Sequence, residues 1–75
     1  MNHAERWARL SQEHEDLIRD ASDRVLAAEA LLEVRVIEAR KVGVTWTTIG
    51  RACGIARWSA TERFQKLPEL QRTLT

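Results

Sequence analysis

The stretch that decides the fold covers residues 44–64 and reads VTWTTIGRACGIARWSATERF. Thr45 is a good helix N-cap, so a short helix is expected over residues 46–53. Gly54 can adopt the left-handed conformation that ends such a helix. A second short helix is expected over about residues 57–66, before the single proline of the chain stops it. The stretch therefore predicts two short helices joined by a tight turn.

The residues before this stretch predict helix throughout. Residues 1–42 contain neither glycine nor proline and are rich in Ala, Leu, Glu and Arg, which all favour helix. The pattern leaves open whether they form one long helix or two. If the helix breaks, the break is expected at residues 20–23, because Asp20, Ser22 and Asp23 are each capable N-caps. Gly43 is placed to end the helix in a left-handed conformation.

Apolar side chains on these 42 residues predict contacts with a partner. Over residues 3–19 they form one narrow stripe, which is completed by His14 as a polar structural member. Over residues 23–42 they form two faces, and the helices that follow can cover only one of them. The sequence therefore predicts that a dimer or partner interface contains Trp7, Leu10, Leu17, Ile18, Leu26, Val34 and Ile37.

Length and composition exclude several classes of protein. Seventy-five residues with 44% apolar and 31% charged side chains predict one small soluble domain, for which a packed dimer would be a help. No apolar run is long enough for a membrane span, and the first residues lack the apolar core of a signal peptide. One cysteine and two histidines predict no disulfide, no metal site and no cofactor. No nucleophile–base pair or glycine-rich phosphate loop is present, so we expect a cytoplasmic protein that is not an enzyme.

Charge is unevenly distributed along the chain. Residues 1–33 contain four basic and eight acidic side chains, a net charge of −4, whereas residues 34–75 contain eight basic and three acidic ones, a net charge of +5. A basic half joined to an acidic half suggests two roles, with a polyanion such as nucleic acid as the partner of the basic half.

Two short helices joined by a glycine turn, after a longer helix, make a helix-turn-helix. Within about residues 36–66 the pattern consists of Ala39-Arg40, Gly43, Trp46, Ile49-Gly50-Arg51-Ala52, Gly54-Ile55, Arg57 and Glu62-Arg63-Phe64. In these residues the sequence resembles region 4 of sigma factors, the related response-regulator output domains and, most closely, the small helix-turn-helix proteins of high-GC Gram-positive bacteria and their phages. Cys53 and Trp58 depart from the usual pattern of those proteins.

This motif implies how the second short helix would meet double-stranded DNA. Its N-terminal part enters the major groove, so its first outward side chains meet base edges. Those expected base contacts are Arg57, Trp58, Thr61 and Glu62. The expected phosphate contacts, which position the protein without reading sequence, are Thr47, Arg51, Ser59, Arg63 and Lys66. Trp46 is expected to pack over the preceding helix instead of touching DNA.

These observations predict an all-α protein with a three-helix helix-turn-helix core preceded by an acidic N-terminal helix. The expected parts are residues 1–22 for dimerisation or partner binding, 23–67 for the DNA-binding core and 68–75 as a short tail. The function expected is sequence-specific DNA binding by a small dimeric transcriptional regulator. The alternatives are a sigma-region-4-like adaptor of the transcription machinery, a DNA-binding antitoxin or phage accessory protein with a partner on its N-terminal helix, and a purely structural interaction domain.

Overall fold

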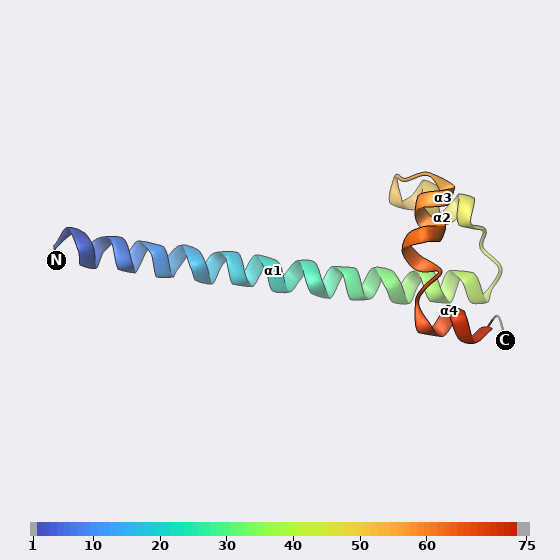
Figure 1. Cartoon of the computed structure of the whole chain (residues 1–75), viewed down its shortest axis with the longest axis horizontal. Helices are drawn as coiled ribbons and strands as arrows, with labels where there is room; N and C mark the ends of the chain where they lie inside the picture. The colour runs from blue at the N-terminus through green and yellow to red at the C-terminus, as the bar shows by residue number, and fades with distance from the viewer. Residues whose placement is uncertain (1, 74–75) are drawn as a thin grey trace.

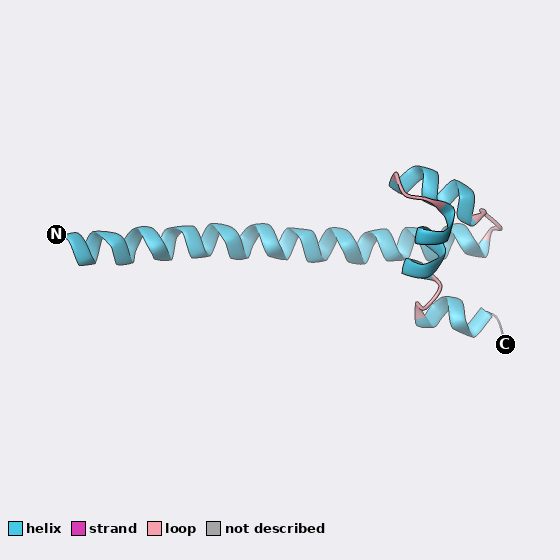
Figure 2. Cartoon of the chain, turned by 45° about the horizontal axis from the view of Figure 1, so that its top comes forward, coloured by secondary structure: helices cyan, strands magenta, loops and turns pink. Residues whose placement is uncertain are grey.

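The computed structural model describes residues 2–73, with side-chain exposure described as far as residue 71. Four helices follow one another along the chain (Figure 1): α1 (His3–Lys41), α2 (Trp46–Cys53), α3 (Arg57–Phe64) and α4 (Pro68–Thr73). No strand occurs within residues 2–73 (Figure 2). The expectation of an all-α chain is confirmed.

A single uninterrupted helix, α1, spans 39 residues, so the break expected at residues 20–23 is wrong. The short polar side chains there remain exposed and do not cap a new helix. Asp20 instead pairs with Arg24 one turn later, at 3.2 Å. Such an i,i+4 pair supports a continuous helix. The N-cap lies at Asn2, whose side-chain oxygen accepts a hydrogen bond from the Glu5 N–H at 2.7 Å.

The end of α1 is fixed by a glycine turn, as the sequence predicted. Gly43 has φ of +90°, which an L side chain rarely adopts. The Gly43 N–H donates to the Arg40 carbonyl at 3.1 Å, and the Val44 N–H donates to the Ala39 carbonyl at 3.0 Å. This pair of bonds is the Schellman motif, and it satisfies two carbonyls that the helix end would leave unpaired.

The corner between α2 and α3 repeats the same device. Thr45 caps α2 by accepting the Thr48 N–H at 3.2 Å, and Gly54 follows the helix with φ of +71°. The Ile55 N–H then donates to the Gly50 carbonyl at 2.9 Å. Gly50 itself is buried, and a Cβ at this position would lie 2.8 Å from the Ile55 carbonyl oxygen. The absence of a side chain at residue 50 therefore allows the turn to close against α2.

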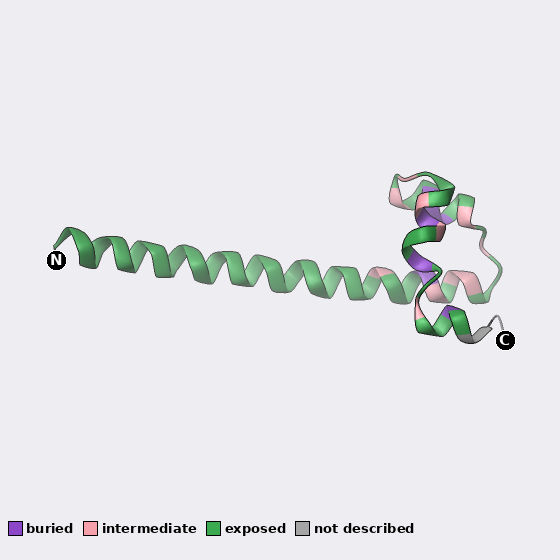
Figure 3. Ribbon diagram, viewed as in Figure 1, coloured by how far each residue is buried: buried purple, intermediate pink, exposed green. Residues whose placement is uncertain are grey.

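A small apolar core joins α2 and α3 to the C-terminal end of α1. Ala60 and Phe64 of α3 are 0% and 1% exposed and pack with Val36 and Ile49. The ends of these helices surround the core (Figure 3), with α2 and α3 on one side of α1 and α4 on the other (Figures 1 and 2). α3 packs chiefly against α2, and the burial of Ala60 and Phe64 in the shared core orients it.

The expected C-terminal tail forms a fourth helix over the part that the structure describes. α3 ends at Phe64, two residues before the expected end at Lys66, and Pro68 begins α4, because a proline at the first position of a helix loses no hydrogen bond. Leu70 is 8% exposed, and α4 packs against α1. The Gln71 side chain adds a 2.7 Å hydrogen bond to the Gln65 carbonyl.

Most of α1 extends beyond this core (Figure 3). The molecule is 63 Å long and at most 23 Å wide, and residues 2–31 are all exposed. Within the described part of the chain, no helix is both long enough and apolar enough to pass through a lipid bilayer.

Candidate functional site

The outer surface of α3 brings four of the expected contact residues together. Arg57, Trp58, Thr61 and Glu62 line one open hollow, and Gln65 completes it. Residues 57, 58, 61, 62 and 65 recur at helical spacing, so they form one strip on the side of α3 away from the Ala60–Phe64 core. The strip presents a guanidinium, an indole, a carboxylate and an amide to solvent. These are groups that can donate to and accept from the edges of bases.

The side chains of this strip differ in their exposure to solvent and in their bonds to the rest of the protein. Trp58 is 69% exposed, so most of its surface is open to solvent. Glu62 is exposed and forms no ion pair with any described side chain. Within the described residues, Glu62 is therefore not a surface charge that is paired with an arginine. The Thr61 hydroxyl donates to the Arg57 carbonyl at 3.0 Å, so it can offer only its acceptor side to a ligand.

The expected phosphate contacts separate into two groups. Thr47, Arg51 and Lys66 are exposed. Ser59 is half-buried, and the Arg63 guanidinium lies over the Phe64 ring, 5.0 Å from its centroid. Arg63 therefore also covers the core, and its removal would affect stability as well as charge.

Among the described side chains, the positive charges around α2 and α3 are unpaired, whereas three arginines of α1 are paired. Arg19, Arg24 and Arg35 each pair with a carboxylate of α1 at 3.0–3.4 Å. Among the described side chains, none forms an ion pair with the four basic residues around α2 and α3, which are Arg51, Arg57, Arg63 and Lys66. Unpaired cations on one part of a chain retain their full attraction for an anionic partner.

Trp46 lies back over α1, as expected from the sequence. The Arg40 guanidinium lies 4.7 Å from the centroid of the Trp46 ring, and it also donates to the Val44 carbonyl at 2.8 Å. Trp46 is half-buried against the core. These contacts fix the corner between α1 and α2, so Arg40 and Trp46 have structural roles.

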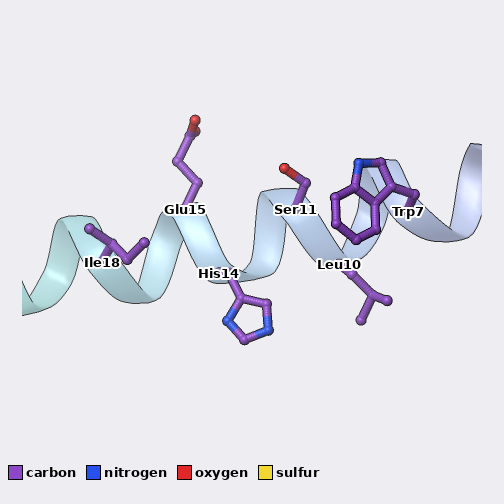
Figure 4. Close-up of a pocket in the computed structure, with 6 residues that line it drawn as sticks. All are labelled: Trp7, Leu10, Ser11, His14, Glu15 and Ile18. Carbon is purple, nitrogen blue, oxygen red and sulfur yellow. The ribbon is translucent and has the colours of Figure 1, made fainter.

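The expected interface residues of α1 lie on different faces. Trp7, Leu17 and Ile18 are 65–68% exposed, and Leu10 is 43% exposed. In Figure 4, Ser11 and Glu15 point to one side of α1 and Leu10 and His14 to the other, around a hollow that Trp7 and Ile18 close at its ends. Leu26 and Val34 are exposed on another face of α1, at about 100° per residue. Ile37 is half-buried in the part of α1 that the core and α4 surround.

A second apolar surface lies where α1 meets α2. It is a groove lined by Leu32, Arg35, Val36, Ala39, Val44, Thr48, Ile49, Ala52 and Cys53. Cys53 is a free, half-buried thiol in this groove and contributes to the core as a small apolar side chain. Among the described residues, no group of three or more His, Cys, Asp or Glu side chains is arranged to hold a metal ion.

Comparison with other proteins shows relatives without assigned functions. Over 58 residues, the chain is 38% identical to uncharacterized proteins from two strains of Mycobacterium tuberculosis and from Mycobacterium bovis. The match covers 68% of this chain but 23% of each relative, so the chain spans about a quarter of their length. No family model matches the chain, and no solved structure matches it significantly.

Proposed function

We propose that this protein binds double-stranded DNA through a helix-turn-helix formed by α2 and α3, with α3 in the major groove. The observation that carries the proposal is the exposed strip of Arg57, Trp58, Thr61, Glu62 and Gln65. Arg57 is placed to donate two hydrogen bonds to guanine, and Gln65 or Glu62 can pair with adenine or cytosine. Arg51 and Lys66 then supply contacts to the phosphates on either side.

The second part of the proposal is that two copies act together as a transcriptional regulator. One recognition helix reads only a few base pairs, so a homodimer on a two-fold site supplies the missing selectivity. The exposed apolar side chains of α1, among them Trp7 and Ile18, support a contact between copies.

Mobility shift with double-stranded DNA at increasing salt tests the first part. Binding through unpaired cations should weaken steeply, with a slope of log affinity against log salt of about −0.9 for each phosphate neutralised. Affinity that does not change between roughly 50 and 200 mM salt would contradict the proposal.

Three arginine variants distinguish base reading from positioning. Arg57→Ala should lose roughly 1–3 kcal/mol of discrimination at one base pair. Arg51→Ala should weaken all sequences about equally and reduce the salt slope by about 1. Arg51 suits this comparison better than Arg63, because Arg63 also covers Phe64. Arg9→Ala, which removes the same charge from the exposed N-terminal part of α1, is the matched control and should change neither.

A second candidate function follows from the same exposed helix. In an adaptor of the transcription machinery, or in an antitoxin or phage accessory protein, α1 would hold a different protein while α3 stays on DNA. The 29 exposed residues at the start of α1, residues 3–31, favour this alternative as a protein-binding arm. Sedimentation of the isolated chain separates the two: a self-associating protein runs as a dimer, whereas an adaptor runs as a monomer.

A further inference from the structure

A row of mostly apolar side chains along one side of α1 follows a seven-residue repeat. Starting from Trp7, steps of four and three residues lead along one side of the helix to Leu32, and we name this set the α1 stripe. Its members are Trp7, Ser11, His14, Ile18, Ala21, Val25, Ala28 and Leu32. Leu10, Leu17 and Leu31 flank the same edge of it. Every member before Leu32 is exposed, so nothing within the described chain covers the stripe.

We infer that a second copy of this chain covers the α1 stripe, with the two α1 helices antiparallel. In this arrangement Ile18 faces Ala21 of the second copy, His14 faces its Val25, and Trp7 faces its Leu32. Each of these layers combines a larger with a smaller side chain. The remaining layer places Ser11 against Ala28, beside the flanking leucines.

A parallel pair would fill the same space poorly. Each residue of the stripe would then meet its own counterpart, with Trp7 on Trp7 and Ala21 on Ala21. Oversized layers would alternate with voids, and both are unfavourable in a packed seam.

The edges of the stripe also fit the antiparallel pair. Leu10 then lies beside Leu31 of the second copy, Leu17 lies along the aliphatic stem of its Arg24, and Glu15 faces Ser22. A parallel pair would gain an ion pair between Arg24 and Glu29, but it would place Leu10 against Glu15.

Charge along α1 favours the same orientation. Residues 20–33 contain one basic and four acidic side chains, whereas residues 6–19 contain three of each. A parallel pair places the acidic segment against its own copy. The antiparallel pair places it against the segment with no net charge, which removes the repulsion.

The stripe is continuous with the groove between α1 and α2. Leu32 belongs to both, so Trp7 of the second copy would lie where the groove opens. Trp7 would also come close to Arg35 of the groove, where a cation–π contact can form. The second copy would thus extend the covered surface from the stripe to the opening of the groove.

This inference rests on the proposed homodimer and specifies its geometry. The two cores would lie at opposite ends of the paired helices, and the two copies of Val36 would be about 50 Å apart along the helix axis at 1.5 Å per residue. That separation exceeds the ~34 Å of one DNA turn. The two DNA sites that one dimer occupies should therefore be centred more than one turn apart.

Cross-linking of the full chain in the absence of DNA tests the orientation. In a Cys53→Ser background, Leu10→Cys and Leu31→Cys proteins are mixed and treated with a short bis-maleimide. The antiparallel pair predicts a cross-linked dimer from the mixture and little from either variant alone. In a parallel pair the two positions lie about 30 Å apart along the helix, so the mixture would gain nothing and each variant would cross-link with itself. That second pattern would overturn the inference.

Because the leucine substitutions change side chains at the edge of the stripe, a second measurement uses an exposed position outside it. A spin label at Glu5→Cys, again without Cys53, should give a distance of about 40 Å between copies in the antiparallel pair. A distance within about 20 Å, or a monomer in sedimentation at tens of micromolar, would overturn it. Both readouts are independent of DNA. A parallel dimer or a monomer that still binds DNA would overturn the antiparallel pair but leave the proposed DNA binding intact. An antiparallel dimer without DNA affinity would overturn only the proposed DNA binding.

Discussion

Gly50 is the position where one methyl group should disturb both the fold and the recognition helix. A Cβ there would lie 2.8 Å from the Ile55 carbonyl oxygen and 3.3 Å from the carbonyl carbon and oxygen of Ala56. All three contacts are with backbone, so no side-chain rotation can relieve them. Overpacking of this kind costs roughly 1–3 kcal/mol. Alanine within a helix recovers about 0.5–1 kcal/mol relative to glycine, so Gly50→Ala should lose up to about 2.5 kcal/mol in net stability.

Urea unfolding followed by circular dichroism measures this loss. Ala52→Gly is the matched control, because residue 52 is exposed in the same helix and reports helix propensity, with an expected loss of about 0.5–1 kcal/mol. The displaced turn leads directly into Arg57, so Gly50→Ala should also weaken DNA binding. A Gly50→Ala protein more stable than the original chain would refute the close approach of α2 and the turn.

Three further changes test other parts of the account. Phe64→Ala removes the most buried large side chain and should cost about 3–5 kcal/mol in urea unfolding, whereas Trp58→Ala on the exposed strip should stay within about 0.5 kcal/mol. Thr45→Ala removes the cap of α2 and should cost about 1 kcal/mol in the same assay; an unchanged midpoint would show that the cap contributes nothing. Deleting residues 1–20 removes much of the α1 stripe, so the truncated protein should sediment as a monomer and bind a two-fold DNA site at least ~10-fold more weakly, an energy of about 1.4 kcal/mol. A truncated protein that remains dimeric would locate the interface elsewhere.

Local signals in the sequence were sufficient for the C-terminal half. Thr45, Gly43 and Gly54 each act through the backbone of their own neighbours, so the caps and turns could be predicted without tertiary information. Ala60 and Phe64 are four residues apart and so lie on one face of α3, which is the buried face. The same periodicity placed Arg57, Trp58, Thr61 and Glu62 on one strip. Gln65 lies one turn beyond Thr61 and could have been found by extending that spacing.

The sequence was ambiguous at residues that can either end a helix or form part of one. Asp20 and Ser22 are good caps, but they are also tolerated on an exposed helix, and the pairing of Asp20 with Arg24 decides for continuity. Pro68 is both a stop for one helix and a good first residue for the next. The double role of Arg40, on Trp46 and on the Val44 carbonyl, depends on the corner between α1 and α2 and has no signal in local spacing.

Selection of DNA from a random pool reports sequence preference without assuming a target, so it is the decisive experiment for DNA reading by α3. We expect the full chain to enrich a sequence with two related half-sites. We also expect Arg57→Ala to select the same sequence with one base pair in each half-site relaxed. A pool without enrichment, or an Arg57→Ala protein that selects every position as strongly as the original chain, would contradict the assignment of α3 as the reading helix.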